Sequence, residues 1–396
     1  ESHADVARLL IDEGAALVDV RTPITRPRQR RQYAERELKV LREGEATNPS
    51  QWPRDGAGDP ARSQGGFTPL LYGVMAGDVE TVRVLLDGGA DVNEAAPDGV
   101  SALMLALTKR HEDLALFLLE QGADPNYDPR LLVLALGSPS LADGQDRVSP
   151  EEDATQPDFA GYSALHVAAA TSQHRALRAI LEAGGDPNTR MDRPKRFIEA
   201  FEIGVFQSPG SGRITHVGST PFMLAAKSAD ADGMRILVEA GADPFATTDD
   251  DTTALALAAG YGKRASSDIT FYVWNQHKAI EAVRYALELG VDINAVNGWG
   301  GTALHGATYH AADELIRFLV ENGADMDKTD WENQTPLRLA KGHMICCTTY
   351  VEHPHIRDLL LELGSDPEVG SQVTFGLLGY HAENKDGSAE PIESAK

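Results

Sequence analysis

The stretch SALHVAAATSQHRALRAILEAGGDPN, residues 163–188, decides the fold. Its opening Ser can accept hydrogen bonds from the free N–H groups of a helix first turn, and the apolar residues behind it favour a short helix. After the polar break TSQ comes a second amphipathic helix, and glycine follows it in the left-handed position that terminates helices. Each helix has one apolar face that it cannot bury alone. A unit of this kind therefore has to stack against copies of itself.

Self-comparison of the chain finds those copies. Segments 68–93, 101–126 and 220–245 align with 163–188 without gaps, and three more units begin at 253, 302 and 335. Three of the units carry Pro directly after the capping residue, where helices need no N–H donor: Pro69, Pro221 and Pro336. Glycines that can close the second helix recur at Gly14, Gly89, Gly122, Gly241 and Gly323. The sequence predicts seven helix-turn-helix repeats preceded by a partial one.

These motifs, in the form Thr-Pro-Leu-His and Gly-Ala-Asp-Val-Asn, resemble the ankyrin repeat. The resemblance implies an all-α ankyrin-repeat solenoid with hairpin fingers, and within that family the long insertions resemble bacterial proteins of which many are exported. The fourth position of the opening motif departs from the pattern, because only His166 and His305 supply its His. Leu71, Met104, Met223, Ala256 and Arg338 stand there in the other units. The inter-repeat hydrogen bonds expected of that His are therefore predicted at two units only.

The spacing of the opening motifs locates insertions in the array. Regular units are 33 residues apart, and longer steps mark added segments. We expect a partial N-terminal repeat at 1–19, a basic finger insertion at 20–66, the array at 67–368 and a C-terminal tail at 369–396. Within the array, insertions are expected at 127–160 and 189–217 on the finger side, and at 261–277 and 342–352 between the two helices of one unit. Long loops of this kind are typically functional or disordered.

The charge of the chain is unevenly distributed. The formal net charge is −24, whereas residues 21–42 carry eight Lys/Arg against two Glu. An acidic body disfavours nucleic-acid binding, so no nucleic-acid partner is expected. The basic stretch, with Arg28, Arg30 and Arg31, is expected either to lie along the acidic surface of the array itself or to bind an acidic partner. No apolar run long enough for a membrane span occurs, and the two cysteines are adjacent, which disfavours a disulfide framework.

Aromatic residues flank the opening motifs and are the candidates for partner binding. They are Phe67, Tyr72, Phe159, Tyr162, Trp299, Tyr309 and Trp331. Exposed rings at such positions are enriched among interface hot spots. The alternative is that they pack finger against finger or beneath the inserted loops.

Signatures of serine hydrolases, phosphate-binding loops, zinc proteases and dinucleotide-binding folds are all missing, so no catalytic residue and no cofactor is expected. The candidates for a metal site are His343, Cys346, Cys347 and His353, but they lack paired C-x-x-C spacing. A polar loop is the favoured interpretation of 343–355.

These patterns favour a non-catalytic protein-binding scaffold that uses the concave groove and the finger insertions of an ankyrin solenoid. One alternative is an accessory subunit of an envelope or exported enzyme complex, which helps to hold a metal-bearing or cofactor-bearing partner. A third is a solenoid hydrolase with a site assembled from loops. The chain begins inside a repeat, which indicates that further residues precede it, and a periplasmic or exported location follows from the family resemblance alone.

Overall fold

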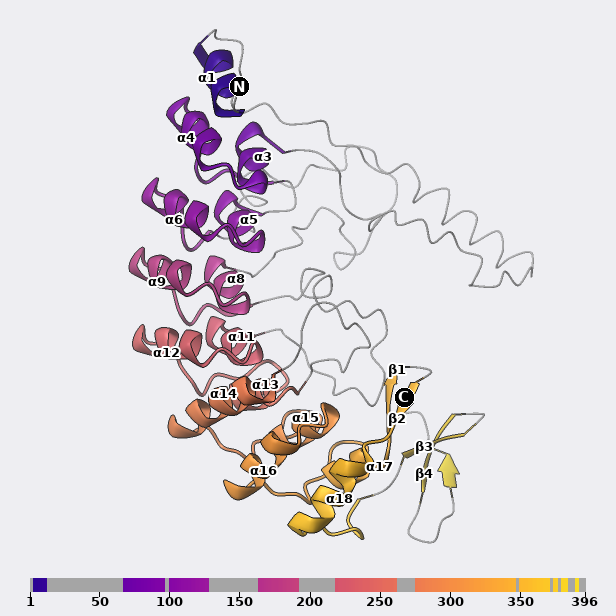
Figure 1. Ribbon diagram of the computed structural model, residues 1–396. Helices are drawn as coiled ribbons and strands as arrows, with labels where there is room; N and C mark the ends of the chain where they lie inside the picture. Colours follow the sequence, from indigo (N-terminus) through magenta and orange to yellow (C-terminus); the bar gives the residue numbers. More distant parts are fainter. Residues whose placement is uncertain are drawn as a thin grey trace, which may run out of the picture. The chain divides into compact units, whose positions relative to one another are not determined.

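The computed structural model describes residues 3–12, 67–96, 100–127, 163–191, 218–261, 275–346, 349–370, 373–376, 379–383 and 389–391. The chain divides into two compact units, Glu1–Phe159 and Ala160–Lys396. Each unit is built from stacked pairs of short antiparallel helices, drawn in Figure 1.

The N-terminal unit contains helices α1 (His3–Asp12), α3 (Pro69–Ala76), α4 (Val79–Asp87), α5 (Ala102–Thr108) and α6 (Glu112–Glu120). In each complete repeat the first helix packs on the second, so α3 packs on α4 and α5 on α6. Helix α3 also packs on α5, and α1 packs on α4. Repeat stacks directly on repeat, as the apolar faces require.

The C-terminal unit continues the same pattern over five repeats. Its first helices are α8 (Ala164–Ala170), α11 (Pro221–Lys227), α13 (Ala254–Ala258), α15 (Ala303–Tyr309) and α17 (Pro336–Lys341). Its second helices are α9 (His174–Glu182), α12 (Ala231–Glu239), α14 (Gln276–Glu288), α16 (Asp313–Glu321) and α18 (Pro354–Leu363). Within this unit the first helices form one row and the second helices another (Figure 1). The ankyrin solenoid expected from the sequence is confirmed.

The predicted caps explain where the helices begin and end. The side chain of Thr68 accepts a hydrogen bond from the Leu71 N–H, and Ser101 and Thr335 cap their helices in the same way. At the other end, Gly89 adopts a φ of +96°, a conformation that costs a residue with a side chain about 1 kcal/mol or more. These local signals fix each helix before any packing is considered.

The two motif histidines connect neighbouring repeats. His305 is fully buried, accepts from the Thr302 N–H through Nδ1 at 3.2 Å, and donates from Nε2 to the Gln334 carbonyl at 3.1 Å. His166 repeats this arrangement with Ser163 and the Ser219 carbonyl. The apolar residues at the other predicted positions, Leu71, Met104, Met223 and Ala256, are buried and offer no such hydrogen bond.

Arg338 stands at the same motif position and forms different hydrogen bonds. Its guanidinium donates to the carbonyls of Val369 (3.2 Å) and Pro367 (2.5 Å). Both acceptors lie beyond α18, so the side chain ties α17 to the segment that follows the array.

Short strands accompany the helices of the C-terminal unit and were not expected from the sequence. Strands β1 (His343–Cys346) and β2 (Thr349–Val351) form an antiparallel pair between α17 and α18, where an insertion was expected. Strands β3 (Val373–Gly376), β4 (Gly379–Glu383) and β5 (Ala389–Pro391) form an antiparallel sheet in that order within the expected tail. Runs of three to five residues are too short for a periodicity argument to identify.

Candidate partner-binding surface at the finger tips

Two neighbouring fingers of the C-terminal unit present a pair of tryptophans. Trp299 lies in the turn before α15 and Trp331 in the turn before α17. Their ring centroids are 5.9 Å apart at an interplanar angle of 70°, an edge-to-face arrangement. Trp331 keeps 49% of its surface exposed. The sequence singled out both residues, and the structure brings them together.

Side chains inside each turn hold these fingers in shape. Asn297 accepts through Oδ1 from the N–H groups of Trp299 (3.1 Å) and Gly301 (2.9 Å). Asp330 accepts through Oδ1 from the N–H groups of Glu332 and Gln334, both at 2.9 Å. Asn and Asp favour turns because their short side chains can satisfy backbone donors in this way.

Backbone contacts then join one finger to the next. The Trp331 N–H donates to the Trp299 carbonyl at 2.8 Å, and the Gly298 N–H donates to the Asp250 carbonyl at 2.7 Å. Gly300 permits this approach, because its φ is +74° and a Cβ there would lie 3.0 Å from the Asp330 Cα. These two backbone hydrogen bonds, together with the turns that they join, form a frame that spans three fingers and holds the backbone of the tryptophan pair.

A buried phenol lies beneath the frame. Tyr261 is 3% exposed, and burial raises its pKa, which the hydrogen bond from Asn297 counteracts and the charges of Asp330 and Asp250 reinforce. Burial also raises the pKa of Asp330 to about 6, although hydrogen bonds from Gln334 and Glu332 oppose the shift. The carboxylate of Asp330 is thus poorly solvated.

Tyr309 does not belong to the exposed surface. It is 8% exposed and packs in a cluster with Ala256, Tyr261 and Leu339. The expectation that its ring faces the groove is therefore wrong. The reason is the stacking of repeats, which places Tyr261 of the preceding repeat against it.

A second aromatic pair lies in the N-terminal unit. The rings of Phe67 and Tyr72 are 5.6 Å apart, and Tyr72 is 44% exposed beside Met75, which is 39% exposed. The remaining candidate residues for partner binding, Phe159, Tyr162, Arg28, Arg30 and Arg31, lie outside the described residues.

In the C-terminal unit, the first helices bury the side chain at the position equivalent to the exposed Tyr72 of the N-terminal unit. That position lies four residues after the capping Thr or Ser. The corresponding side chains are at most 2% exposed: Val167, Leu224, Leu257 and Leu339. Exposed aromatic surface in this unit is found instead at the finger tips and at Phe245, which is 59% exposed and which the sequence analysis did not select.

The metal candidates are only partly described. The side chains of His343 and Cys346 and the whole of Cys347 lie outside the description. The His353 ring meets that of His355 edge to face at 6.3 Å, and burial, followed by the charge of His355, lowers the pKa of His353. Among the residues that are described, no three His, Cys, Asp or Glu side chains form a metal-binding group.

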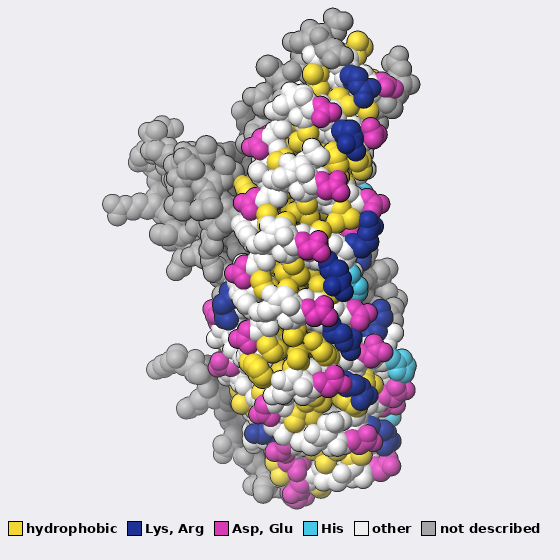
Figure 2. Space-filling view, turned by 90° about the vertical axis from the view of Figure 1, so that its left-hand side faces the viewer, with side chains coloured by type: hydrophobic (Ala, Val, Ile, Leu, Met, Phe, Trp, Pro, Cys, Tyr) yellow, Lys and Arg dark blue, Asp and Glu magenta, His cyan; other side chains and the backbone are white. Residues whose placement is uncertain are grey.

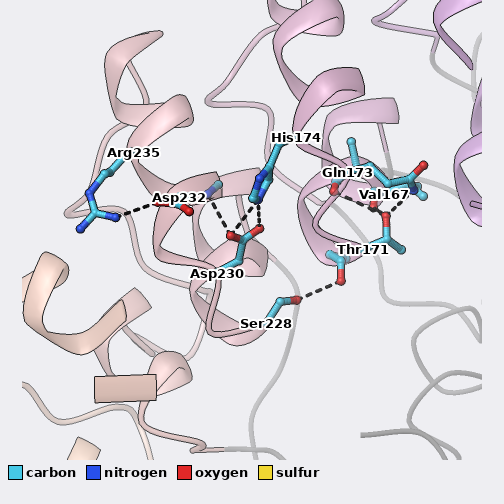
Figure 3. A network of polar contacts seen from close by, with 11 residues as sticks. Val167, Thr171, Gln173, His174, Ser228, Asp230, Asp232 and Arg235 are labelled. Carbon is cyan, nitrogen blue, oxygen red and sulfur yellow. Dashed lines mark hydrogen bonds and ion pairs between the residues drawn. The ribbon is translucent and has the colours of Figure 1, made fainter. Parts of the chain in front are cut away.

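A polar network between two repeats contains a histidine, a carboxylate and a serine (Figure 3). His174 contacts both oxygens of Asp230, at 2.8 and 2.9 Å, and Asp230 also caps α12 through the Gly233 N–H. The nearby Ser228 hydroxyl donates to the Ala170 carbonyl at 2.9 Å. Ser228 is thereby committed to a backbone acceptor, so the group fastens one repeat to the next and does not resemble an activated nucleophile.

The second helices of each unit form its outer face, where arginines recur at equivalent positions as a ladder that the sequence analysis missed. Lys and Arg side chains recur along the second helices beside Asp and Glu (Figure 2). Arg83, Arg235 and Arg284 each lie over a ring of the following repeat, at 4.5, 4.9 and 4.7 Å from the centroids of Phe117, Tyr285 and Phe318. Arg178 and Arg317 instead pair with Glu239 and Glu362 of the following repeat. The signal in the sequence is an Arg six residues before the helix-terminating Gly.

The family assignment follows from the repeats. The model described as ankyrin repeats in three copies matches residues 52–128 and 270–370, and the model of the single ankyrin repeat matches 160–192 and 217–249. Together the matches span more than half of the chain. The chain is an ankyrin-repeat protein. Ankyrin repeats are generally scaffolds for protein–protein interaction, and the fold is typically not an enzyme.

Relatives share the repeats at low identity. The ankyrin-repeat protein is 26% identical over 74% of its length to the E3 ubiquitin-protein ligase KEG of Arabidopsis thaliana, and 29% identical over 63% to human neurogenic locus notch homolog protein 1. It spans only 19% and 8% of those two proteins. A putative ankyrin repeat-containing protein of Treponema pallidum is 28% identical over 36% of the chain and is itself covered over 45%. The crystal structure of the human ASB11 ankyrin repeat domain aligns with 76% of the chain at 18% identity and a TM-score of 0.48.

None of the described helices combines the length and the apolar character that crossing a bilayer requires.

Proposed function

We propose that this ankyrin-repeat protein is a non-catalytic scaffold that binds a protein partner through the finger tips of its C-terminal unit. The observation that carries the proposal is the exposed Trp331, paired with Trp299 on a hydrogen-bonded frame. Tryptophan is enriched among residues that dominate binding energy, and a side chain already fixed in place loses little entropy on binding.

In this unit, the burial of side chains on the first helices favours binding at the finger tips and disfavours binding in the groove. Val167, Leu224 and Leu257 are at most 2% exposed, so they offer no surface to a partner. The N-terminal unit differs, because Tyr72 and Met75 are exposed there. We propose that these two side chains form a second partner-binding surface, which belongs to the N-terminal unit alone.

Site-specific photo-crosslinking tests the proposal. A benzophenone amino acid is placed at Val296, which is 44% exposed on the finger that carries Trp299, or at Leu361 of α18, a comparably accessible control that is 42% exposed. We expect a covalent adduct with a partner protein from position 296 and none from 361 after irradiation in the native host. Equal adducts from both positions, or none from 296, would contradict binding at the finger tips.

A bacterial, exported setting as the accessory subunit of an envelope complex is also proposed, on the family resemblance and the similarity to the Treponema pallidum protein. In that role, segment 343–355 would be the part of the chain that helps to hold a metal-bearing partner. Elemental analysis of the purified protein checks this alternative. A stoichiometric ion that is lost on Cys346→Ser or His353→Ala would favour it, whereas a metal-free protein leaves the simple scaffold.

A further inference from the structure

We propose that the surface formed by Trp299, Trp331 and the carboxylates around them binds an arginine or lysine side chain in a basic, extended segment of the partner protein. This inference rests on the proposed function and names the chemistry of its partner. Three features of the structure converge on it: the exposed ring of Trp331 beside Trp299, the charge of the fingers and the rigidity of the frame.

The rings are suited to a cation. Indole has the most electron-rich face of the protein side chains and attracts a guanidinium or ammonium group within about 6 Å of the centroid. The same protein already uses this contact, since Arg235 and Arg284 lie 4.9 and 4.7 Å above aromatic centroids on its outer face. Trp331 differs in being 49% exposed at a finger tip.

The charge of the three fingers selects a cation over a neutral apolar group. Segments 247–253, 294–302 and 327–335 contain six acidic residues, Asp249, Asp250, Asp251, Asp327, Asp330 and Glu332, against the single base Lys328. Several of the six already have partners within the chain. Asp249 pairs with Arg190 at 3.3 Å, Asp250 accepts from the Thr248 and Thr252 hydroxyls, and Asp327 accepts from the Ser365 hydroxyl and the Asp366 N–H. The hydrogen bonds leave the negative charge of Asp250 and Asp327 in place. The whole chain carries a net charge of −24, which would steer a basic segment towards this surface.

Burial of Asp330 adds an energetic reason. Its pKa is raised to about 6 because burial disfavours the charged carboxylate. A cation placed over the adjacent Trp331 would stabilise that charge, since an opposite charge within several ångströms favours the ionised form. A neutral apolar partner would bury the carboxylate further at a cost.

Rigidity means that the site exists before the partner arrives. The Trp331 N–H to Trp299 carbonyl bond, the turn built on Asn297 and the close approach at Gly300 hold the backbones of the two tryptophans together. Binding therefore loses little conformational entropy on the side of the scaffold. An apolar or proline-rich segment could also contact the rings, and the experiment separates it from a basic one.

The test measures binding of a capped hexa-arginine peptide to the full chain by isothermal titration calorimetry, with a hexa-citrulline peptide and a hexa-proline peptide as neutral comparisons. Because an acidic protein attracts polyarginine generally, the decisive reading is the change on Trp331→Ala. We expect a loss of about 5- to 10-fold in affinity, in the range of a cation–π contact. The matched control Phe245→Ala removes an exposed ring, 59% accessible, that lies outside segments 247–253, 294–302 and 327–335, and it should leave the affinity unchanged.

Further variants keep the result interpretable. Trp331→Phe retains a ring and should restore part of the lost affinity, and Asp330→Asn should weaken binding without altering the helical circular dichroism signal. Equal affinity in the wild type and Trp331→Ala overturns the proposal, and so does equally tight binding of the citrulline or proline peptide. The photo-crosslink from position 296, which leaves Trp331 in place, separates this failure from failure of the scaffold function. An adduct that excess hexa-arginine does not compete away leaves the scaffold standing and refutes the cation.

Discussion

Replacing His305 by Gln is expected to remove part of the acid sensitivity of the C-terminal unit. In the folded protein Nδ1 of His305 accepts from the Thr302 N–H and meets the Thr302 hydroxyl at 2.8 Å, while Nε2 donates to the Gln334 carbonyl. A neutral ring with its proton on Nε2 satisfies all these contacts. Protonation of Nδ1 would place a donor against a donor and bury a charge.

The magnitude follows from the pKa difference. Burial lowers the pKa of His305 from 6.5 to about 4, against a weaker opposing effect of the hydrogen bond to Gln334. Because the folded value is depressed, the stabilising contribution is complete above pH 6.5 and is lost as the pH falls towards 4. Integration over the proton-binding difference gives a loss of about 2 kcal/mol between pH 7 and pH 5.

Urea unfolding at pH 7 and pH 5, followed by tryptophan fluorescence, measures this quantity. The emission of Trp299 and Trp331 reports on the repeats that contain His305. We expect the wild type to lose about 2 kcal/mol more stability than His305→Gln over this range. His277→Gln, at an exposed histidine beside Glu314, is the matched control and should behave like the wild type.

The titration of Asp330 changes the stability in the opposite direction as the pH falls. The comparison between variants therefore has to exclude its contribution. Its folded pKa is raised to about 6, so its contribution is present at low pH and lost as the pH rises through 6. The group is common to all three proteins, and the difference between them therefore isolates His305. If the wild type and His305→Gln lose the same stability between pH 7 and pH 5, the buried neutral histidine inferred from the structure does not exist.

Three further outcomes are expected. Gly300→Ala should cost about 1–3 kcal/mol and shift the tryptophan emission, because a side chain at φ +74° is strained and meets Asp330; unchanged emission would show that the fingers are not held by this contact. A double-mutant cycle of Arg284→Met and Phe318→Leu should give a coupling energy of about 0.5–1 kcal/mol in thermal or urea unfolding, and a value near zero would remove the outer ladder as a stabilising element. Deletion of 21–42 should lower the stability of the N-terminal unit if the basic segment lies on the acidic array, whereas unchanged stability with loss of partner capture would assign it to the partner.

The sequence by itself determined the repeat and its local geometry. Capping residues such as Thr68 and helix-ending glycines such as Gly89 act on the backbone within a few residues, so their effects can be recognised without knowing the neighbours. The two motif histidines, His166 and His305, were also predicted, because their hydrogen bonds connect positions at fixed offsets in adjacent repeats. Fold and helix boundaries therefore followed from short-range chemistry.

Only the tertiary structure decided which aromatic residues are available. Trp331 and Tyr309 both flank an opening motif in the sequence, yet one is 49% exposed and the other 8%. Tyr261 of the preceding repeat packs on Tyr309, whereas Trp331 lies in a turn between repeats. The outer arginines show the same dependence. Their spacing is visible in the sequence, but whether Arg284 meets a ring or Arg317 a carboxylate is fixed by the residue that the next repeat places opposite. Such pairings join residues through the stacking of helices, and no short-range pattern encodes them.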